Sequence, residues 1–217
     1  MKTKQLITTL SIAALTLTAC SSDEPQTSED QQAQGIESTE GAGTMQAGEY
    51  EIHPELGGHA TLQIPADTTS EEVAPFEEYR QENNLEPVTY LTVDADNRDG
   101  TEMLKFPEIT VYDEQGNAYT FEHVEDATSQ WEPERSWDMD DEQFWSPDGS
   151  TITLDEYLAF ESQYKELTDD TTTIVNPAER ATILLAYNGD DLPEEFTRVS
   201  AMTYGLGYEE DAHPTDD

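Results

Sequence analysis

Two groups of residues have types and spacing that could support chemistry: a single cysteine and a carboxylate-rich loop at 94–102. Cys20 carries the one thiol of the sequence, and a thiolate is a nucleophile that can be alkylated or oxidised. It follows Lys2, Lys4 and an apolar run over 6–17. That run is shorter than the roughly 20 residues of a spanning helix and is typical of an export signal. We therefore expect Cys20 to lie at the end of a removable leader.

The residues around this cysteine, Leu17-Thr18-Ala19-Cys20, resemble the lipobox of bacterial lipoproteins. The resemblance implies that the thiol of Cys20 is alkylated by a diacylglyceryl group and that a signal peptidase cleaves between Ala19 and Cys20. Two acyl chains anchor a protein stably, whereas one chain binds a bilayer only marginally. We therefore expect a lipid-anchored protein on the extracytoplasmic face of the cell membrane. The alternative is a soluble secreted protein with an unmodified cysteine.

The charge of the chain narrows the classes of partner. It carries 49 Asp and Glu against 9 Lys and Arg, a formal net charge of −40. Nucleic-acid binding and electrostatic attachment to an anionic membrane both depend on cationic side chains, so both are excluded. Self-repulsion of this size destabilises a compact state unless salt screens it, and the Debye length is about 3 Å at 1 M salt. We interpret the acidity as adaptation to high salt. A dedicated binder of cations or cationic polymers is the alternative.

Composition also predicts the domain organisation. Residues 21–49 contain only two large apolar side chains, Ile36 and Met45, and burying them is too little to offset the entropy of ordering the segment. One cysteine cannot form an intramolecular disulfide, so a packed core must stabilise the rest. The expected parts are a signal peptide (1–19), the lipidated cysteine with a disordered acidic linker (20–49), a folded domain (50–210) and an acidic tail (211–217).

Apolar and polar residues alternate in short runs, which predicts a mainly β domain. The run 181–187 is continuously apolar and is expected to be a central strand, and a Gly-containing loop at 113–117 predicts a hairpin. Helices are expected over 76–84 and over 154–167, the second one with a capping box formed by Thr153 and Glu156. The other expected strands are 60–64, 88–95, 103–106, 109–112, 118–121, 172–175 and 196–206.

Three of these features together resemble the immunoglobulin-like domains of unknown function on Gram-positive lipoproteins. They are a strand that runs into a polar loop (88–100), the hairpin 109–119, and a proline turn, apolar strand and Leu-Pro bend over 177–193. The resemblance covers most of 86–206, with an acidic insertion at about 125–170. It implies an antiparallel immunoglobulin-like β-sandwich with one or two short helices in insertions, and it transfers no catalytic residues.

The loop Asp94–Glu102 offers oxygen ligands of the kind that calcium prefers. Its spacing differs from that of an EF-hand because Arg98 occupies the fifth position. In so acidic a chain, carboxylate clusters also arise from composition alone, and we expect no metal and no cofactor. A second resemblance to an EF-hand ends at Glu156, but it places Trp145, Pro147 and Gly149 at positions that need side-chain oxygens. A capped helix start is the simpler interpretation of that segment.

The aromatic and histidine residues leave the ligand open. Trp131, Trp137 and Trp145 could form a stacking platform for a sugar or polymer, but packing at a sheet edge is the more common role, and we expect packing. The histidines have neither metal-ligand spacing nor a neighbouring nucleophile motif. They are His53, His59, His123 and His213.

The sequence therefore predicts a monomeric membrane-anchored lipoprotein with a non-catalytic domain for binding or envelope interaction. Its ligand would be a protein, a glycan or a cation. A calcium- or cation-responsive surface-binding protein is the alternative. A hydrolase built on a carboxylate pair comes third, because acids are everywhere and the sequence does not show their geometry.

Overall fold

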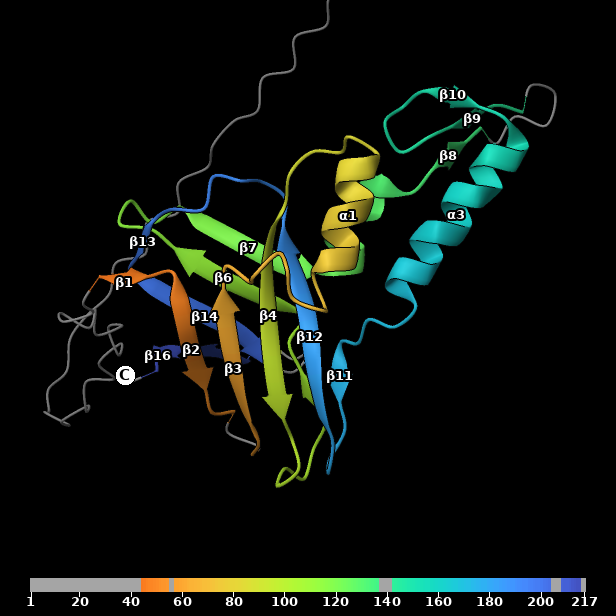
Figure 1. The fold of residues 1–217 in the computed structure, drawn as a ribbon. Coiled ribbons are helices and arrows are strands. Elements are labelled where there is room, and N and C mark those ends of the chain that lie inside the picture. The colour runs from red at the N-terminus through yellow and green to blue at the C-terminus, as the bar shows by residue number, and fades with distance from the viewer. Residues whose placement is uncertain (1–43, 55–56, 137–141, 204–207, 216–217) are drawn as a thin grey trace, which may run out of the picture. The chain divides into compact units, whose positions relative to one another are not determined.

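The computed structural model describes residues 44–54, 57–136, 142–203 and 208–215 (Figure 1). All of them belong to the second of two compact units, which spans Glu40–Asp217. This unit is mainly antiparallel β structure with few short helices, which confirms the predicted class. No helix in these ranges is both long and apolar enough to cross a bilayer.

The main sheet has nine strands, and each neighbouring pair is antiparallel. In chain order the strands are β2 (Gly48–Ile52), β3 (His59–Ile64), β4 (Thr89–Asp96), β6 (Glu108–Tyr112), β7 (Ala118–His123), β12 (Arg180–Tyr187), β14 (Arg198–Thr203), β15 (Tyr208–Asp211) and β16 (His213–Pro214). Their order in space is β15-β14-β6-β7-β12-β4-β3-β2-β16. The predicted central strand is therefore confirmed, because β12 occupies the middle of the sheet.

Smaller elements surround this sheet. The short strands are β1 (Met45–Gln46) paired with β13 (Glu195–Phe196), β5 (Leu104–Lys105) paired with β11 (Ile174–Val175), and the three-stranded set β8 (Glu134–Arg135), β9 (Phe144–Trp145) and β10 (Thr151–Ile152). The helices are α1 (Ala74–Glu82), α2 (Val124–Ala127), the 3-10 turn η1 (Ser129–Trp131) and α3 (Leu154–Thr168).

The main sheet forms a nearly closed barrel rather than the clear sandwich that we expected. β15 and β16 lie at opposite ends of the strand order, yet only Ala212 separates them in the chain. Ala212 is buried, and its amide donates to the carbonyl of Val199 at 2.9 Å. One short segment thus pairs with β14 on one side and with β2 on the other, which joins the two edges of the sheet.

Two boundaries also differ from those expected. Within 211–217, predicted to be an acidic tail, Asp211 ends β15 and His213 and Pro214 form β16. Residues 45–49, predicted to be linker, contribute β1 and the start of β2. Both segments are too short and too polar for their composition to predict a strand. They become strands because neighbouring strands offer them backbone partners.

The two central strands bury apolar side chains on both faces, which explains why β12 has a continuous apolar run. On one face, Val93 of β4 and Ile183 of β12 belong to the barrel core, the larger apolar cluster of the unit. On the other face, Tyr90 and Leu184 belong to a second cluster, which we call the helical-layer core. Its other main members come from the helical segments and are Val73, Phe76, Tyr79, Trp131 and Tyr164.

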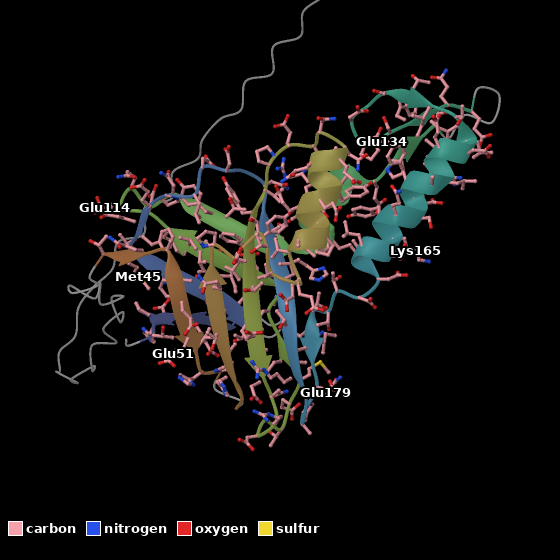
Figure 2. All side chains as sticks on the ribbon, viewed as in Figure 1. Met45, Glu51, Glu114, Glu134, Lys165 and Glu179 are labelled. Atoms are coloured by element: carbon pink, nitrogen blue, oxygen red, sulfur yellow. The ribbon has the colours of Figure 1, made fainter. Side chains whose placement is uncertain are left out.

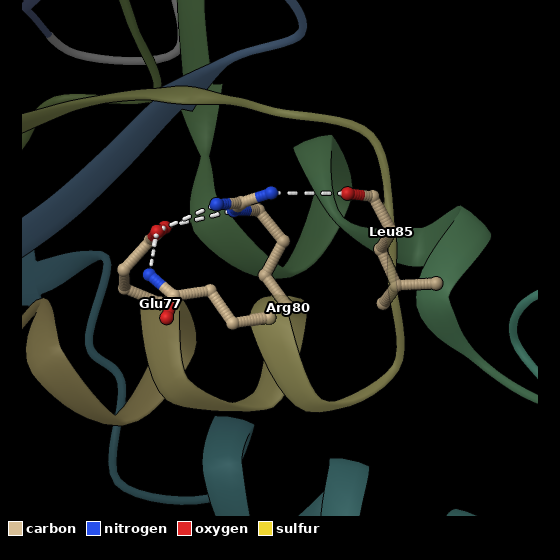
Figure 3. Close-up of polar contacts among 4 residues, drawn as sticks. Glu77, Arg80 and Leu85 are labelled. Atoms are coloured by element: carbon tan, nitrogen blue, oxygen red, sulfur yellow. Dashed lines mark hydrogen bonds and ion pairs between the residues drawn. The ribbon is translucent and has the colours of Figure 1, made fainter.

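Helix α1 lies to the right of the upper end of β12 in Figure 1 and supplies much of this second core. Pro75 lies in its first turn, and the helix starts after Val73 rather than at 76. Its last turn is held by Arg80, which donates to both carboxylate oxygens of Glu77 at 2.6 and 2.8 Å and to the carbonyl of Leu85 at 3.1 Å (Figure 3). The ion pair lies within the helix, and the hydrogen bond to Leu85 connects the helix to the segment that leads into β4.

Candidate functional site: a groove along helix α3

The carboxylate-rich loop 94–102, which was weighed as a calcium site, uses Asp94 and Asp96 for local structure. Asp94 accepts a hydrogen bond from Thr182 Oγ1 at 2.6 Å. Asp96 is buried and accepts from the backbone and guanidinium of Arg98, which holds the pKa of that carboxyl well below its usual value. Asp94 is therefore bonded to strand β12, and Asp96 is bonded to a residue of its own loop. Among the described residues, no group of three or more His, Cys, Asp or Glu side chains could hold a metal ion.

Asn97 is the structural centre of this loop. Its fully buried side chain donates from Nδ2 to the carbonyls of Glu102 at 2.8 Å and Val175 at 2.9 Å. Its backbone amide donates to the carbonyl of Glu179 at 2.9 Å. A Cβ on Gly100 would lie 1.8 Å from Asn97 Oδ1, so only glycine fits there. The loop therefore ties the end of β4 to the β11–β12 connection.

The segment that resembled the end of an EF-hand forms a turn and a helix cap. The side chain of Ser146 donates to Asp148 Oδ1 at 2.5 Å and accepts from the amide of Ser150 at 3.1 Å, which closes the turn between β9 and β10. Thr153 and Glu156 then form the predicted capping box of α3. The capped helix start is confirmed.

The structure describes two of the three tryptophans and does not describe the lipobox cysteine. Trp131 is 1% exposed and stacks on Tyr79 with ring centroids 6.3 Å apart, so packing is confirmed for this residue. Trp145 is half-buried in β9. Trp137, Ala19 and Cys20 lie outside the described residues.

The histidines do not converge on one site. The ring centroids of His53 and His59 lie 6.4 Å apart. Both residues line an open hollow of about 620 Å³, together with Asp96 and Arg98. His213 is exposed on β16. His123 is buried at the end of β7, and this burial lowers its pKa.

A groove of about 660 Å³ lies between α3 and the segment that includes α2 and the residues before β8. A second hollow of about 490 Å³ shares Glu132, Pro133, Tyr157 and Glu161 with it and extends to β8. Figure 2 labels Glu134 on β8 and Lys165 on α3, which line the second hollow and the first one respectively. We call the two connected hollows the α3 groove.

The floor of the α3 groove is aromatic and well supported. Tyr157, Tyr164 and Thr168 recur along one face of α3 and are buried. The hydroxyl of Tyr164 donates to the carbonyl of Glu125 at 3.2 Å and lies 3.1 Å from Thr128 Oγ1. This hydrogen bonding fixes α3 against the α2 segment, which is why the groove exists between them.

The rim of the α3 groove is acidic. Of its exposed carboxylates, Glu161 accepts from the hydroxyl of Tyr157 at 3.0 Å. Within the described ranges, Glu125, Glu132 and Asp169 have no side-chain hydrogen bond or ion pair. Lys165 also lines the groove, and it forms no ion pair within 4.0 Å in the same part of the chain.

Glu132 acts electrostatically on two buried tyrosines, Tyr164 in the floor of the groove and Tyr79 in the helical-layer core. Burial, with a contribution from the negative charge of Glu132, raises the pKa of Tyr79 and of Tyr164 to about 12. The phenols therefore stay neutral at physiological pH, and the charge of the groove comes from its carboxylates, which outnumber the two cations Lys165 and Arg135. Carboxylates beside aromatic rings attract cations through both Coulomb and cation–π interactions.

The sequence did not reveal this groove. Tyr157, Phe160, Tyr164 and Leu167 recur at helical spacing, and the two tyrosines are buried while Phe160 and Leu167 are half-buried. Glu125 and Glu132 approach that face from a segment far upstream in the chain, and no local pattern marks them.

Comparisons with protein-family models, with curated protein sequences and with solved structures each found no match.

Proposed function

We propose that this protein is a membrane-anchored extracytoplasmic lipoprotein whose β domain binds a cationic ligand in the α3 groove without catalysing a reaction. The anchor is supported by the lipobox-like sequence that ends at Cys20. The binding role is supported by the rim of carboxylates that lack partners in the described part of the chain. We also propose that the domain is a monomer, related to the immunoglobulin-like domains of Gram-positive lipoproteins through the hairpin β6–β7 and the strands around it.

The observation that carries the binding proposal is the pairing of unsatisfied carboxylates with a neutral tyrosine floor. The groove volume of about 660 Å³ lies in the range of roughly 300–1,000 Å³ that is typical of small-molecule sites. The described residues offer no cluster that fits a bare metal ion. These features favour an organic cation over calcium.

Isothermal titration with spermidine, a flexible polyamine, tests this site. We expect Glu132→Gln to weaken binding by about fivefold or more, because one charge-assisted contact in a partly desolvated site is lost. The matched control is Glu114→Gln, in the exposed β6–β7 turn and also labelled in Figure 2. If the two variants bound spermidine with equal affinity, binding would depend on the net charge of the protein and not on the groove. That result would reject the site.

The anchor has its own test. Mass spectrometry of the protein from its native host should find a diacylglyceryl group on Cys20 as the first residue. Cys20→Ser should release the protein from the membrane fraction. An unmodified thiol on a chain that still begins at Met1 would contradict this part of the proposal.

The excess of negative charge is proposed to be an adaptation to high salt. Its support is the composition, in which Lys105 and Lys165 are the only lysines after residue 19. Thermal unfolding should then shift to higher temperature as NaCl rises from about 0.1 M to 1 M, since salt screens repulsion between like charges. A melting temperature that falls over this range would reject the interpretation.

A further inference from the structure

We propose that the occupant of the α3 groove is a polypeptide segment that carries both basic and apolar side chains, rather than a small cation. This inference rests on the proposed binding role of the groove and adds the class of its partner. It is argued from the exposed apolar side chains that lie beside the acidic rim on helix α3.

The apolar part of the surface is a pair of leucines on α3. Within the described ranges, the large apolar side chains with high exposure are Met103, Leu154 and Leu158. Leu154 and Leu158 are each 48% exposed and stand one helical turn apart. Residues four apart in a helix share a face, so these side chains form one apolar ridge. Leu158 itself lines the groove.

The ridge and the acidic rim together form an elongated surface. At 100° per residue, Leu154, Leu158, Glu161 and Lys165 fall on one side of the helix, next to the buried tyrosines. The surface from Leu154 to Asp169 is roughly 22 Å long at 1.5 Å per residue. That length matches about seven residues of extended chain. A small cation would satisfy some carboxylates but would leave the leucine ridge in water.

Charge decides which kind of segment fits. Residues 20–43 of this chain contain acids and no Lys or Arg, so they would be repelled by the rim. A second copy, with a net charge of −40, would be repelled as a whole. A segment with basic side chains instead meets Glu125, Glu132 and Asp169, while its apolar side chains cover the leucines. The ammonium of Lys165 can donate to backbone carbonyls of the bound segment.

Two synthetic peptides of twelve residues test this proposal on the full-length chain by fluorescence anisotropy. Both carry four lysines at the same positions. One has three leucines, and the other has serines in their place. We expect the leucine peptide to bind about tenfold more tightly, because the ridge buries its apolar side chains.

The matched variants are Leu154→Ser with Leu158→Ser, and Met103→Ser as a control on another exposed apolar side chain. All of these side chains are exposed, so thermal unfolding should confirm that each variant folds. The double variant should bind both peptides equally, whereas Met103→Ser should keep the tenfold difference. Loss of the difference in Met103→Ser as well would contradict the ridge.

Glu132→Gln separates this inference from the proposed function. In one outcome, Glu132→Gln lowers the affinity for both peptides, and the wild-type protein binds the leucine and serine peptides equally. This result supports the acidic groove and rejects the apolar ridge. If Glu132→Gln leaves the affinity for both peptides unchanged, the groove is not the binding site and both proposals fail. Weaker binding of both peptides together with a leucine preference supports both proposals.

Discussion

The loop 94–102 and the α3 groove are both rich in acids, but they differ in what those acids contact. In the loop, Asp94 is bonded to Thr182 and the buried Asp96 to Arg98, whereas the exposed side chains of Asp99 and Glu102 have no hydrogen bond in the described part of the chain. In the groove, Glu132 and Asp169 have no such partner among the described residues. The loop is therefore a structural connection, whereas the groove retains charge that a ligand can neutralise.

This difference matters because acids are abundant throughout the chain. Where carboxylates are common, a cluster in the sequence arises by chance and carries little functional information. Whether a carboxylate already has a partner is more informative, because a satisfied group gains little from a new ligand. The following variants test whether the loop and the groove really differ in this way.

The largest effect is expected from Asn97→Ala in the loop. The change leaves the part-buried carbonyl of Glu102 and the buried carbonyl of Val175 without their donor, which costs about 3 kcal/mol in the free energy of unfolding. Urea unfolding monitored by tryptophan fluorescence measures this cost. Asp99→Ala, an exposed change in the same loop, should stay within about 0.5 kcal/mol. Equal effects would show that the loop is not held by Asn97.

A smaller effect is expected from Thr153→Ala, which removes the capping box of α3. The lost cap should lower the free energy of unfolding by about 1 kcal/mol. Because α3 forms one wall of the groove, spermidine affinity should fall slightly as well. Thr151→Ala, an exposed threonine in β10, is the control. An unchanged stability for Thr153→Ala would mean that tertiary packing alone holds the helix start.

The pH dependence should separate the two regions further. Arg98 lowers the pKa of Asp96 in the folded state, so this carboxylate binds a proton less readily there than in the unfolded chain. Its contribution to stability is therefore present above about pH 4 and is lost as pH falls. Asp96→Asn should reduce the loss of stability on acidification below pH 4, as measured by thermal unfolding. An acid limb identical to that of wild type would contradict the role given to this pair.

The smallest effect on stability is expected from Glu132→Gln in the groove. This exposed carboxylate has no described partner to lose, and its removal relieves repulsion, so the free energy of unfolding should rise or stay within about 0.5 kcal/mol. Urea unfolding at low salt is the measurement. A clear loss of stability would place Glu132 in the same structural class as Asp96 and would remove the contrast.

Some features could be predicted because the groups that determine them are close in sequence. The hairpin β6–β7 depends on a turn in which Asp113 accepts from the amides of Gln115 and Asn117, with Gly116 at φ 80°. The capping box of α3 likewise depends on Thr153 and Glu156 alone. Such interactions form within a few residues, so their residue types indicate them directly.

Other features depended on distant partners. The expected sandwich was replaced by a nearly closed barrel because β15 and β16 join the two edges, and nothing local in their acidic sequence indicates this pairing. The acidic insertion at about 125–170 was expected to carry the helix over 154–167. It supplies Trp131 and Tyr164, which bury the outer face of β4 and β12.

By itself, the sequence determined most of the longer strands, the turn and cap chemistry, and the excess of negative charge, because these follow from residue type, alternation and near neighbours. Only the tertiary structure decided which carboxylates are satisfied and where the unsatisfied ones gather. The physical reason is that hydrogen bonds and salt bridges depend on separations of a few ångströms between side chains. For Glu132 and the face of α3, only folding brings the two sides together.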